Sequence, residues 1–527
     1  MLRREFLMTM GSGAFLAFAH PLIGAARAEQ TKPGFDDNPI GGYVKTPPKA
    51  YLFTDHRLIR TGDLDWVGPD GKGLPVAGPP EPVVDARAVP NFVPYGIRFV
   101  AQPARTEPVE GDPPAGPPGL VVSAHGSYWV FHFRVDYQPG RNLGSYSTAD
   151  PDAVWISAAK SDDLHQWKDL GKCKLALPGQ SRFDGFTAFV DDHGLPSERF
   201  KAVYMARPPE DQIPALWYAY RKIHPRYRDV RISSDNFTCI YGVTSPDGIK
   251  WTPIKEPLFT HYSDTDTTVY YDEWLGRYVM YTRLYLTGRR MIAIAEAEDF
   301  RKWGPVSPLI WPGLEEPLST DVYTNARTCY PGMPEVHLML PMFYHRFDQT
   351  SDIRLFSSID GLHWSQVPGG PVLTPRSFAD RRTEFIVASK PLLPLANDRV
   401  GFRYSASPYP HKYPRWKEIL ASAKGGWAGW EKGRLVALTA DEEGEFVTFS
   451  IPVTGRELRI NARTPRAGMI KVGFDGRPIE DCDPIVGDSF AHPVRWRGNP
   501  DVGIEQGKSV SIKFHLRRAE LFGFEWV

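Results

Sequence analysis

Residues 245–251 read Ser-Pro-Asp-Gly-Ile-Lys-Trp, and residues 358–364 read Ser-Ile-Asp-Gly-Leu-His-Trp. Looser versions of this turn close on tryptophan at 161–167, 298–303 and 422–430. Each turn ends a stretch with the same order: an acidic residue, a β-like run, and a second run that ends in arginine. Recurrence of one pattern at roughly blade length is the sequence signature of a propeller. The chain is therefore predicted to be all-β, with a five-bladed β-propeller.

The acid and the arginine of each predicted blade are expected to meet at one mouth of the propeller. An inner strand starts at one face and the next antiparallel strand returns to it, so residues before the first and after the second converge. In blade order the acids are Glu110, Asp184, Asp266, Asp321 and Glu384, and the arginines are Arg134, Arg207, Arg283, Arg346 and Arg403. The sequence thus predicts a ring of carboxylates and guanidinium groups.

The composition favours a globular protein with many turns. The chain has 527 residues, of which 42% are hydrophobic and 24% charged, and it is long enough for more than one domain. Fifty prolines, 47 glycines and 13% aromatic residues suit many short strands joined by turns. Basic and acidic residues balance at 62 each, which argues against a surface for nucleic acid. We expect a carbohydrate as partner and no nucleic acid.

The repeat order is lost after the fifth unit. Short strands remain, such as 446–451 and 509–514, with turn residues between them. Evenly spaced short strands of this kind indicate a small β-sandwich. We therefore expect a linker or arm at 29–50, the propeller at 51–435 and a C-terminal β-sandwich at 436–527.

The first residues resemble an export signal. Arg3 and Arg4 are followed by an apolar stretch and by an Ala-Arg-Ala site at 26–28. Paired arginines and such a site are typical of a twin-arginine signal peptide, with an ordinary Sec signal as the alternative. We expect cleavage after residues 1–28 and a periplasmic or secreted product. No later run of about 18 apolar residues predicts a membrane span in the mature chain.

The cysteines do not indicate a metal site. They lie far apart and show no CxxC or Cys/His ligand spacing: Cys173, Cys239, Cys329 and Cys482. We interpret them as small buried apolar side chains. Nothing in the spacing of other residues argues for a metal, so no metal and no cofactor are predicted.

One segment carries a family resemblance. Residues 52–59 read Leu-Phe-Thr-Asp-His-Arg-Leu-Ile, and together with the Ser-x-Asp-Gly-x-x-Trp turns they resemble secreted bacterial members of the five-bladed β-propeller glycosidase superfamily. That group holds fructosidase-like and arabinanase-like enzymes of glycosyl hydrolase families 32 and 43. The resemblance covers roughly 50–527 and implies an exported glycoside hydrolase. The fructosidase patterns Asn-Asp-Pro-Asn, Arg-Asp-Pro and Glu-Cys are absent, so catalytic assignments are not carried across.

The predicted ring could supply the chemistry that the resemblance implies. A glycosidase needs two carboxyl groups beside the scissile bond, one protonated as acid and one ionised as nucleophile or base. Repulsion and burial raise one pKa in such a ring, while a nearby arginine lowers another. Our first catalytic candidates are Glu110 and Asp266, with Asp184 and Glu384 as alternates. For each single acid, a turn cap or a structural arginine pair is the competing interpretation.

The other polar residues of the ring are candidates for substrate binding. Asp321 is expected to orient the substrate or tune a pKa, with hydrogen bonds added by Tyr323 and Asn325. The arginines would hold hydroxyls or a carboxylate: Arg134, Arg207, Arg283, Arg346 and Arg403. Asp55 is predicted either to contact the sugar or to pin the first strand.

Two other functions stay open at this stage. One is a non-catalytic glycan-binding propeller. The other is a sialidase-like or uronate-processing enzyme, because several arginines can bind a substrate carboxylate bidentately. Within the closing turns, Asp162, Asp247 and Asp360 are expected to cap the turn, while Trp251 and Trp364 pack between sheets.

Overall fold

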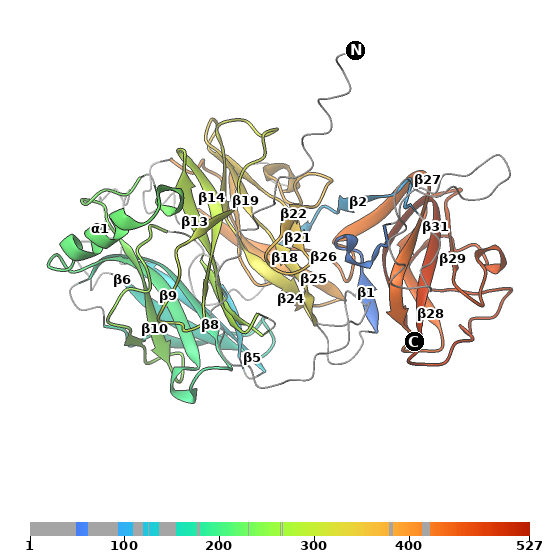
Figure 1. Cartoon of the computed structure of the whole chain (residues 1–527), viewed down its shortest axis with the longest axis horizontal. Helices are drawn as coiled ribbons and strands as arrows, with labels where there is room; N and C mark the ends of the chain where they lie inside the picture. The colour runs from blue at the N-terminus through green and yellow to red at the C-terminus, as the bar shows by residue number, and fades with distance from the viewer. Residues whose placement is uncertain are drawn as a thin grey trace, which may run out of the picture. The chain divides into compact units, whose positions relative to one another are not determined.

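The computed structural model describes residues 49–61, 93–108, 120–124, 126–135, 154–176, 180–229, 231–263, 265, 267–273, 275–378, 383–413 and 422–527. These residues belong to one compact unit, Asn38–Val527. Antiparallel sheets dominate it, and α1 (Ile213–Lys222) is the single α-helix in the described ranges (Figure 1). Short 3-10 helices join the strands: η1 (His56–Leu58), η3 (Pro196–Glu198), η4 (Pro225–Tyr227), η5 (Pro375–Ser377) and η6 (Ile479–Asp481). The prediction of an all-β chain is confirmed.

The first three repeats form three separate antiparallel sheets in which each strand pairs with the next along the chain. The first sheet contains β4 (Leu120–Ala124), β5 (Ser127–Val135), β6 (Val154–Ser161) and β7 (Lys168–Lys172). The second contains β8 (Ser181–Val190), β9 (Phe200–Arg207), β10 (Cys239–Ser245) and β11 (Thr252–Pro253). The third contains β12 (Thr268–Asp272), β13 (Arg277–Leu286), β14 (Arg289–Ala297) and β15 (Ser307–Ile310). This up-and-down order is the one expected of propeller blades.

The fourth repeat divides between two small sheets. One contains β16 (Thr320–Thr324), β19 (Met342–His345) and β20 (Thr350–Ile353). The other contains β17 (Arg327–Tyr330), β18 (Met333–Met339), β21 (Phe356–Ser358) and β22 (Trp364–Gln366). The division falls at Ala326, whose φ of 39° interrupts the extended backbone between β16 and β17.

The last repeat sheet is completed by a strand from upstream of the first repeat. It contains β23 (Phe385–Ala388), β24 (Leu393–Leu395), β25 (Arg399–Ser407), β26 (Lys424–Glu431) and β3 (Arg105–Pro108). β3 pairs with β26, and Glu107 lies opposite Trp427. The two ends of the repeat region therefore share one sheet.

A seven-stranded sheet follows the repeats. It contains β1 (Ala50–Leu52), β2 (Arg98–Ala101), β27 (Val436–Pro452), β28 (Leu458–Arg463), β29 (Met469–Gly473), β30 (Asp488–Pro493) and β31 (Ser509–Trp526). Strand β31 pairs along one edge with β27 and then β1, and along the other with β29 and then β28. These strands surround a core of their own.

The segment at 50–59 differs from its predicted place. Sequence analysis put it at the start of the propeller, whereas β1 pairs with β31 of the terminal sheet. The cause is burial: the ring of Phe53 lies 5.4 Å from that of Phe446 and 6.0 Å from that of Phe514. Its apolar side chains thus complete the core of the terminal sheet.

The closing turns are held by short-range hydrogen bonds. Ser245 Oγ accepts a hydrogen bond from Gly248 N at 2.9 Å. Asp247 Oδ1 accepts from Ile249 N at 2.9 Å and from Lys250 N at 2.8 Å. Trp251 Nε1 donates to Gly248 O at 2.9 Å. The same bonds recur in the turn at 358–364.

One residue of these turns was predicted wrongly. In the turn at 161–167 the capping carboxylate is Asp163, whose Oδ1 accepts from Gln166 N at 2.7 Å. Asp162 instead accepts a hydrogen bond from Ser127 Oγ at 2.7 Å. In each of the three turns, the aspartate that caps the turn is the one four positions before the tryptophan.

The cysteines and the helices give two further results. All four cysteines are unpaired, and three of them, Cys173, Cys239 and Cys482, are buried. None of the helices in the described part of the chain is long and apolar enough to cross a membrane.

Candidate functional site

Asp184 is the predicted catalytic acid with the most distinctive backbone. Glu110 and Asp266 lie outside the described residues. Asp184 is half-buried in β8, and its Oδ1 accepts a hydrogen bond from Gly185 N at 2.7 Å. The register of β8 against β9 shifts on both sides of Asp184. Such irregularities re-aim side chains and are frequent beside active sites.

The backbone at Asp184 lies against a segment of the third repeat. Gly185 has a φ of 67°, and a Cβ at this position would lie 3.2 Å from Ser263 O and 3.6 Å from Thr265 O. Two features therefore favour glycine at position 185: the positive φ and the close approach of the backbone at Ser263 and Thr265. The second and third repeats meet at this point.

Glu384 occupies a different position. It directly precedes β23, is half-buried, and its backbone N donates to Ser407 O at 2.9 Å. No hydrogen bond or ion pair joins its side chain to Asp184 or to any other residue that the structure describes.

Polar side chains from three repeats meet in what we call the polar junction: Thr267, Thr268, Asn325 and Lys390. Thr268 Oγ1 donates to Asn325 Oδ1 at 2.6 Å, across 57 positions of sequence. Lys390 Nζ donates to Thr267 O at 3.0 Å and to Thr268 Oγ1, from 123 and 122 positions away. Thr267 Oγ1 also lies 3.2 Å from Thr282 Oγ1. The starts of the third, fourth and fifth repeats therefore converge.

Next to this junction, four arginines surround one tyrosine. We call Arg231, Arg283, Arg290 and Arg346, together with Tyr285, the arginine cluster. Their guanidinium carbons lie 4.2, 5.9, 5.1 and 5.9 Å from the centre of the Tyr285 ring. At these distances the ring attracts each cation. The cluster collects residues from the loop after η4, from β13, from β14 and from the end of β19.

Asp321 is the counter-ion of two cluster arginines. Its side chain is fully buried in β16, and both of its oxygens accept hydrogen bonds. Oδ1 accepts from Arg290 N at 3.0 Å and from Arg346 Nη2 at 2.7 Å, while Oδ2 accepts from Arg290 Nη1 at 2.5 Å and from Arg346 Nε at 2.8 Å. These contacts raise the pKa of Arg346. Asp321 therefore orders the cluster and has no oxygen left for proton transfer.

Two further predicted residues contact these groups. The ring of Tyr323 lies 4.3 Å from the Arg290 guanidinium carbon and 5.3 Å from that of Arg283. Asn325 belongs to the polar junction, and its Nδ2 donates to Tyr281 O at 3.4 Å. The structure thus brings together Arg283, Asp321, Tyr323, Asn325 and Arg346 of the predicted set.

A buried histidine supports the backbone beneath Arg283. His261 is 1% exposed, and burial lowers its pKa to about 4. It is therefore neutral at pH 7, and because its Nε2 contacts Arg283 O, that nitrogen carries the proton and donates it.

The other predicted arginines lie outside the cluster. Arg134 Nε donates to Ser157 Oγ at 3.1 Å, and burial lowers the pKa of Arg134. Arg207 pairs with Glu210 at 2.9 Å. Arg403 is 2% exposed and its guanidinium carbon lies 5.7 Å from the ring centre of Trp427.

Asp55 pins the N-terminal segment. It forms a 2.6 Å ion pair with Arg57, which in turn donates to Glu335 O at 2.5 Å and Ser358 O at 2.7 Å. Asp55 Oδ1 also accepts from Arg57 N at 2.9 Å, as the cap of η1. These contacts agree with the structural alternative for this residue.

Six residues of these two groups were not predicted from the sequence: Arg231, Thr267, Thr268, Tyr285, Arg290 and Lys390. Arg290 is the second residue of β14, just after the turn at Thr287 and Gly288, and the adjacent Arg289 makes an Arg-Arg pair that could have been noted in the sequence. Arg231 ends a basic stretch at 221–231 in which nothing singles it out, and Lys390 is a single basic residue. Only the tertiary contacts bring them to the site.

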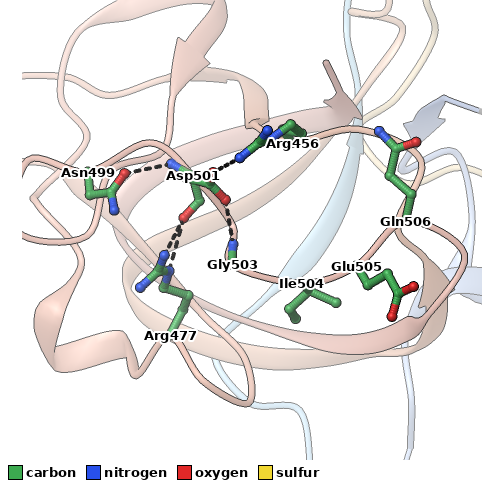
Figure 2. A pocket seen from close by; sticks show the side chains of 8 residues that line it. All are labelled: Arg456, Arg477, Asn499, Asp501, Gly503, Ile504, Glu505 and Gln506. Atoms are coloured by element: carbon green, nitrogen blue, oxygen red, sulfur yellow. Dashed lines mark hydrogen bonds and ion pairs between the residues drawn. The ribbon is translucent and has the colours of Figure 1, made fainter.

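A separate open groove lies in the terminal sheet region (Figure 2). It has a volume of about 670 Å³ and is lined by Arg456, Arg477, Asn499, Asp501, Gly503, Ile504, Glu505 and Gln506. Figure 2 shows that its polar groups bond to one another, as in the 2.6 Å ion pair of Arg456 with Asp501. No aromatic ring is among these lining residues, so the groove lacks a platform for a sugar. In the residues that the structure covers, no cluster of three or more metal-ligating side chains exists.

Comparison with known proteins gives structural similarity alone. No family model matches the chain, and no curated protein matches it. Similar solved structures include a glycoside hydrolase (14% identity, 63% of this chain and 92% of that chain, TM-score 0.39). A thermostable family-43 glycoside hydrolase has 13% identity, 63% and 95% coverage, and a TM-score of 0.40. The Bombyx mori GH32 β-fructofuranosidase BmSUC1 has 9% identity, 82% and 93% coverage, and a TM-score of 0.38.

These names are of the kind that the sequence resemblance indicated, glycoside hydrolases of families 32 and 43. With TM-scores below 0.5 they carry no argument about the site. The chemistry has to be inferred from the chain's own residues.

Proposed function

We propose that the chain is a glycoside hydrolase whose catalytic acids lie at the mouth of a five-bladed β-propeller. The observation that carries the proposal is the placement of Asp184 on a bulged strand, with Gly185 packed against Ser263 and Thr265. Thr265 directly precedes Asp266 in the sequence, and Ser263 lies three positions before it. Cleavage of a glycosidic bond needs two carboxyl groups, and Asp184 and Asp266 are the pair that we propose.

Three features support the propeller arrangement. The five repeats each start a new sheet, β3 completes the last of them, and the polar junction connects the starts of three. Neighbouring blades that close into a ring would produce these contacts. We infer that the terminal sheet curls into an accessory β-sandwich, because the two halves of β31 have different partners on both edges.

The two acids are assigned different roles. Lys390 Nζ donates to Thr267 O, which places a cation beside the residue that follows Asp266. A neighbouring positive charge favours the ionised form of a carboxyl group, so Asp266 is assigned as nucleophile or base. Asp184, with Glu110 as the alternate, is assigned as the general acid.

The test compares Asp184→Asn and Asp266→Asn with Asp192→Asn as the matched control. Asp192 lies near Asp184 in sequence, but its side chain is 70% exposed and pairs with Arg199. We expect either catalytic change to slow hydrolysis of aryl glycosides or polysaccharides by roughly 10²–10⁴-fold in a folded protein, and the control to have no effect. Full activity in both catalytic variants would contradict the proposal, and sugar binding without any turnover would favour a glycan-binding propeller.

We also propose export of the protein by the twin-arginine route. The support is Arg3 and Arg4 followed by the Ala-Arg-Ala site at 26–28. Residues 1–28 fused to a reporter should export it in a folded state, and replacing both arginines by lysine should stop export. A reporter that is still exported after this change would indicate the Sec route.

A further inference from the structure

We propose that the arginine cluster binds an oxyanion, the carboxylate or sulfate group of an acidic sugar in the substrate. This inference rests on the proposed function, because it names the substrate class of that site. Arg290 and Arg346 both bind the carboxylate of Asp321, whereas Arg231 contacts the Tyr285 ring and has no ion pair among the described residues. Asp321 therefore does not pair with Arg231, whose positive charge is not part of an ion pair in the part of the chain that the structure describes.

Arg231 is the cation that can meet a ligand. It is exposed, and no ion pair engages its guanidinium group within the described ranges. The guanidinium carbon lies 4.2 Å from the centre of the Tyr285 ring, so a cation–π contact holds the group while its N–H donors make no ion pair with the residues that the structure covers. Its backbone is also fixed, since Arg231 N donates to Asp229 Oδ1 at 2.8 Å.

Arg346 connects the buried and exposed parts of the cluster. Its side chain is 34% exposed, whereas that of Arg290 is 8% exposed. Besides Asp321, Arg346 Nη2 reaches Gly288 O at 2.5 Å, so the turn between β13 and β14 adjoins it. The cluster therefore runs from a buried ion pair to a solvent-accessible, positively charged edge.

An apolar rim borders this edge. Leu318 is 88% exposed and Phe347 is 93% exposed. Arg346 N donates to Ser319 O at 3.0 Å, which brings the loops of these two side chains together. A sugar ring offers an apolar face to such a rim and, when it bears an acidic group, an oxyanion to the arginines.

Binding, rather than turnover, tests the inference. Isothermal titration compares a glucuronic-acid oligosaccharide with its neutral glucose counterpart on wild type, Arg231→Gln and Arg226→Gln. Arg226 is the matched control, an exposed arginine in η4 whose guanidinium group has no ion pair among the described residues. We expect the wild type to favour the acidic ligand at least about tenfold, since a hydrogen bond to a charged group contributes that much.

Arg231→Gln should remove most of this preference and Arg226→Gln none of it, and high salt should reduce it in the wild type. Equal binding of the acidic and neutral sugars, or an unchanged preference in Arg231→Gln, would overturn the proposal. Inorganic phosphate and sulfate are titrated in parallel. Arg231-dependent binding of a free anion with no preference for the acidic sugar would identify the free ion as the source of the oxyanion and overturn the assignment to the sugar.

A failure of the oxyanion proposal can be distinguished from a failure of the proposed glycoside hydrolase activity. Selective binding of the acidic sugar without hydrolysis would reject the hydrolase and keep the oxyanion site. Hydrolysis of neutral glycans with no preference for the acidic ligand would do the reverse.

Discussion

Replacement of Asp321 by asparagine removes the carboxylate that holds Arg290 and Arg346 together. The Asp321 side chain is fully buried, and both oxygens accept hydrogen bonds from the two arginines. Asparagine keeps the shape, but it has no negative charge and presents N–H donors to guanidinium donors. Arg290, 8% exposed at its side chain, would then carry a buried charge without its partner.

The expected cost follows from that burial. Removing one partner of a buried ion pair costs roughly 3–5 kcal/mol, because the remaining charge stays desolvated. Arg346 is 34% exposed, so water can solvate it and Arg290 determines most of the loss. We expect Asp321→Asn to lower the free energy of unfolding by about 3–4 kcal/mol. Arg346→Gln leaves the pair of Asp321 with Arg290 and should cost about 1–2 kcal/mol.

Urea and thermal unfolding of the full chain, followed by tryptophan fluorescence and circular dichroism, measure these losses. The control is Asp441→Asn, whose partner Arg98 lies at 3.0 Å and whose pair is 69% and 55% exposed at the two side chains. An exposed pair of this kind contributes at most about 1 kcal/mol. A loss in Asp321→Asn no greater than that in Asp441→Asn would refute the buried counter-ion argument.

Three more predictions concern single sites. Trp251 is 5% exposed, so Trp251→Ala should lower the free energy of unfolding, measured by thermal unfolding, by about 3–5 kcal/mol. Trp311 is 47% exposed, so Trp311→Ala is the control and should cause no measurable loss. The hydrogen bond from His345 to Asp352 raises the pKa of His345, so its stabilisation is complete below the ordinary pKa of about 6.5 and is lost as pH rises through the folded-state pKa. Unfolding midpoints measured from pH 5 to 9 should show this loss in the wild type and not in Asp352→Asn. Lys201→Met leaves Asp191 buried and should cost roughly 3–5 kcal/mol by urea denaturation, and an unchanged midpoint would contradict that value.

The parts of the fold that sequence analysis predicted correctly depend on local contacts. In the closing turn at 245–251, the hydrogen bonds of Ser245 Oγ, Asp247 Oδ1 and Trp251 Nε1 join residues within three positions of one another, so the sequence itself contains this pattern. The paired strands between turns follow from short loops in the same way. Such features recur because each repeat can form them without reference to the rest of the chain.

The parts that could not be predicted depend on distant contacts. Phe53 joins the core of the terminal sheet through rings almost 400 and more than 450 positions away. Arg231 and Tyr285 come from different repeats, and only folding stacks one on the other. The acid–arginine order predicted a symmetric ring, whereas the cations of the described site concentrate in the third and fourth repeats.

The acids of the repeats differ in their partners, and this difference helps to distinguish a structural role from a chemical one. If each acid existed only to pair with the arginine of its own repeat, all of them would resemble Asp321, which binds Arg346 through both oxygens. In the second repeat the arginine pairs instead with Glu210, and Arg207 lies opposite Ser181 in the sheet, whereas Asp184 lies opposite Met205. Asp184 remains half-buried on a strand whose register breaks on both sides of it. The second repeat therefore departs from the structural pattern, since its arginine has another partner and its strand is distorted at the acid. Because we propose Asp184 as the general acid, Asp184→Asn should affect turnover more than stability.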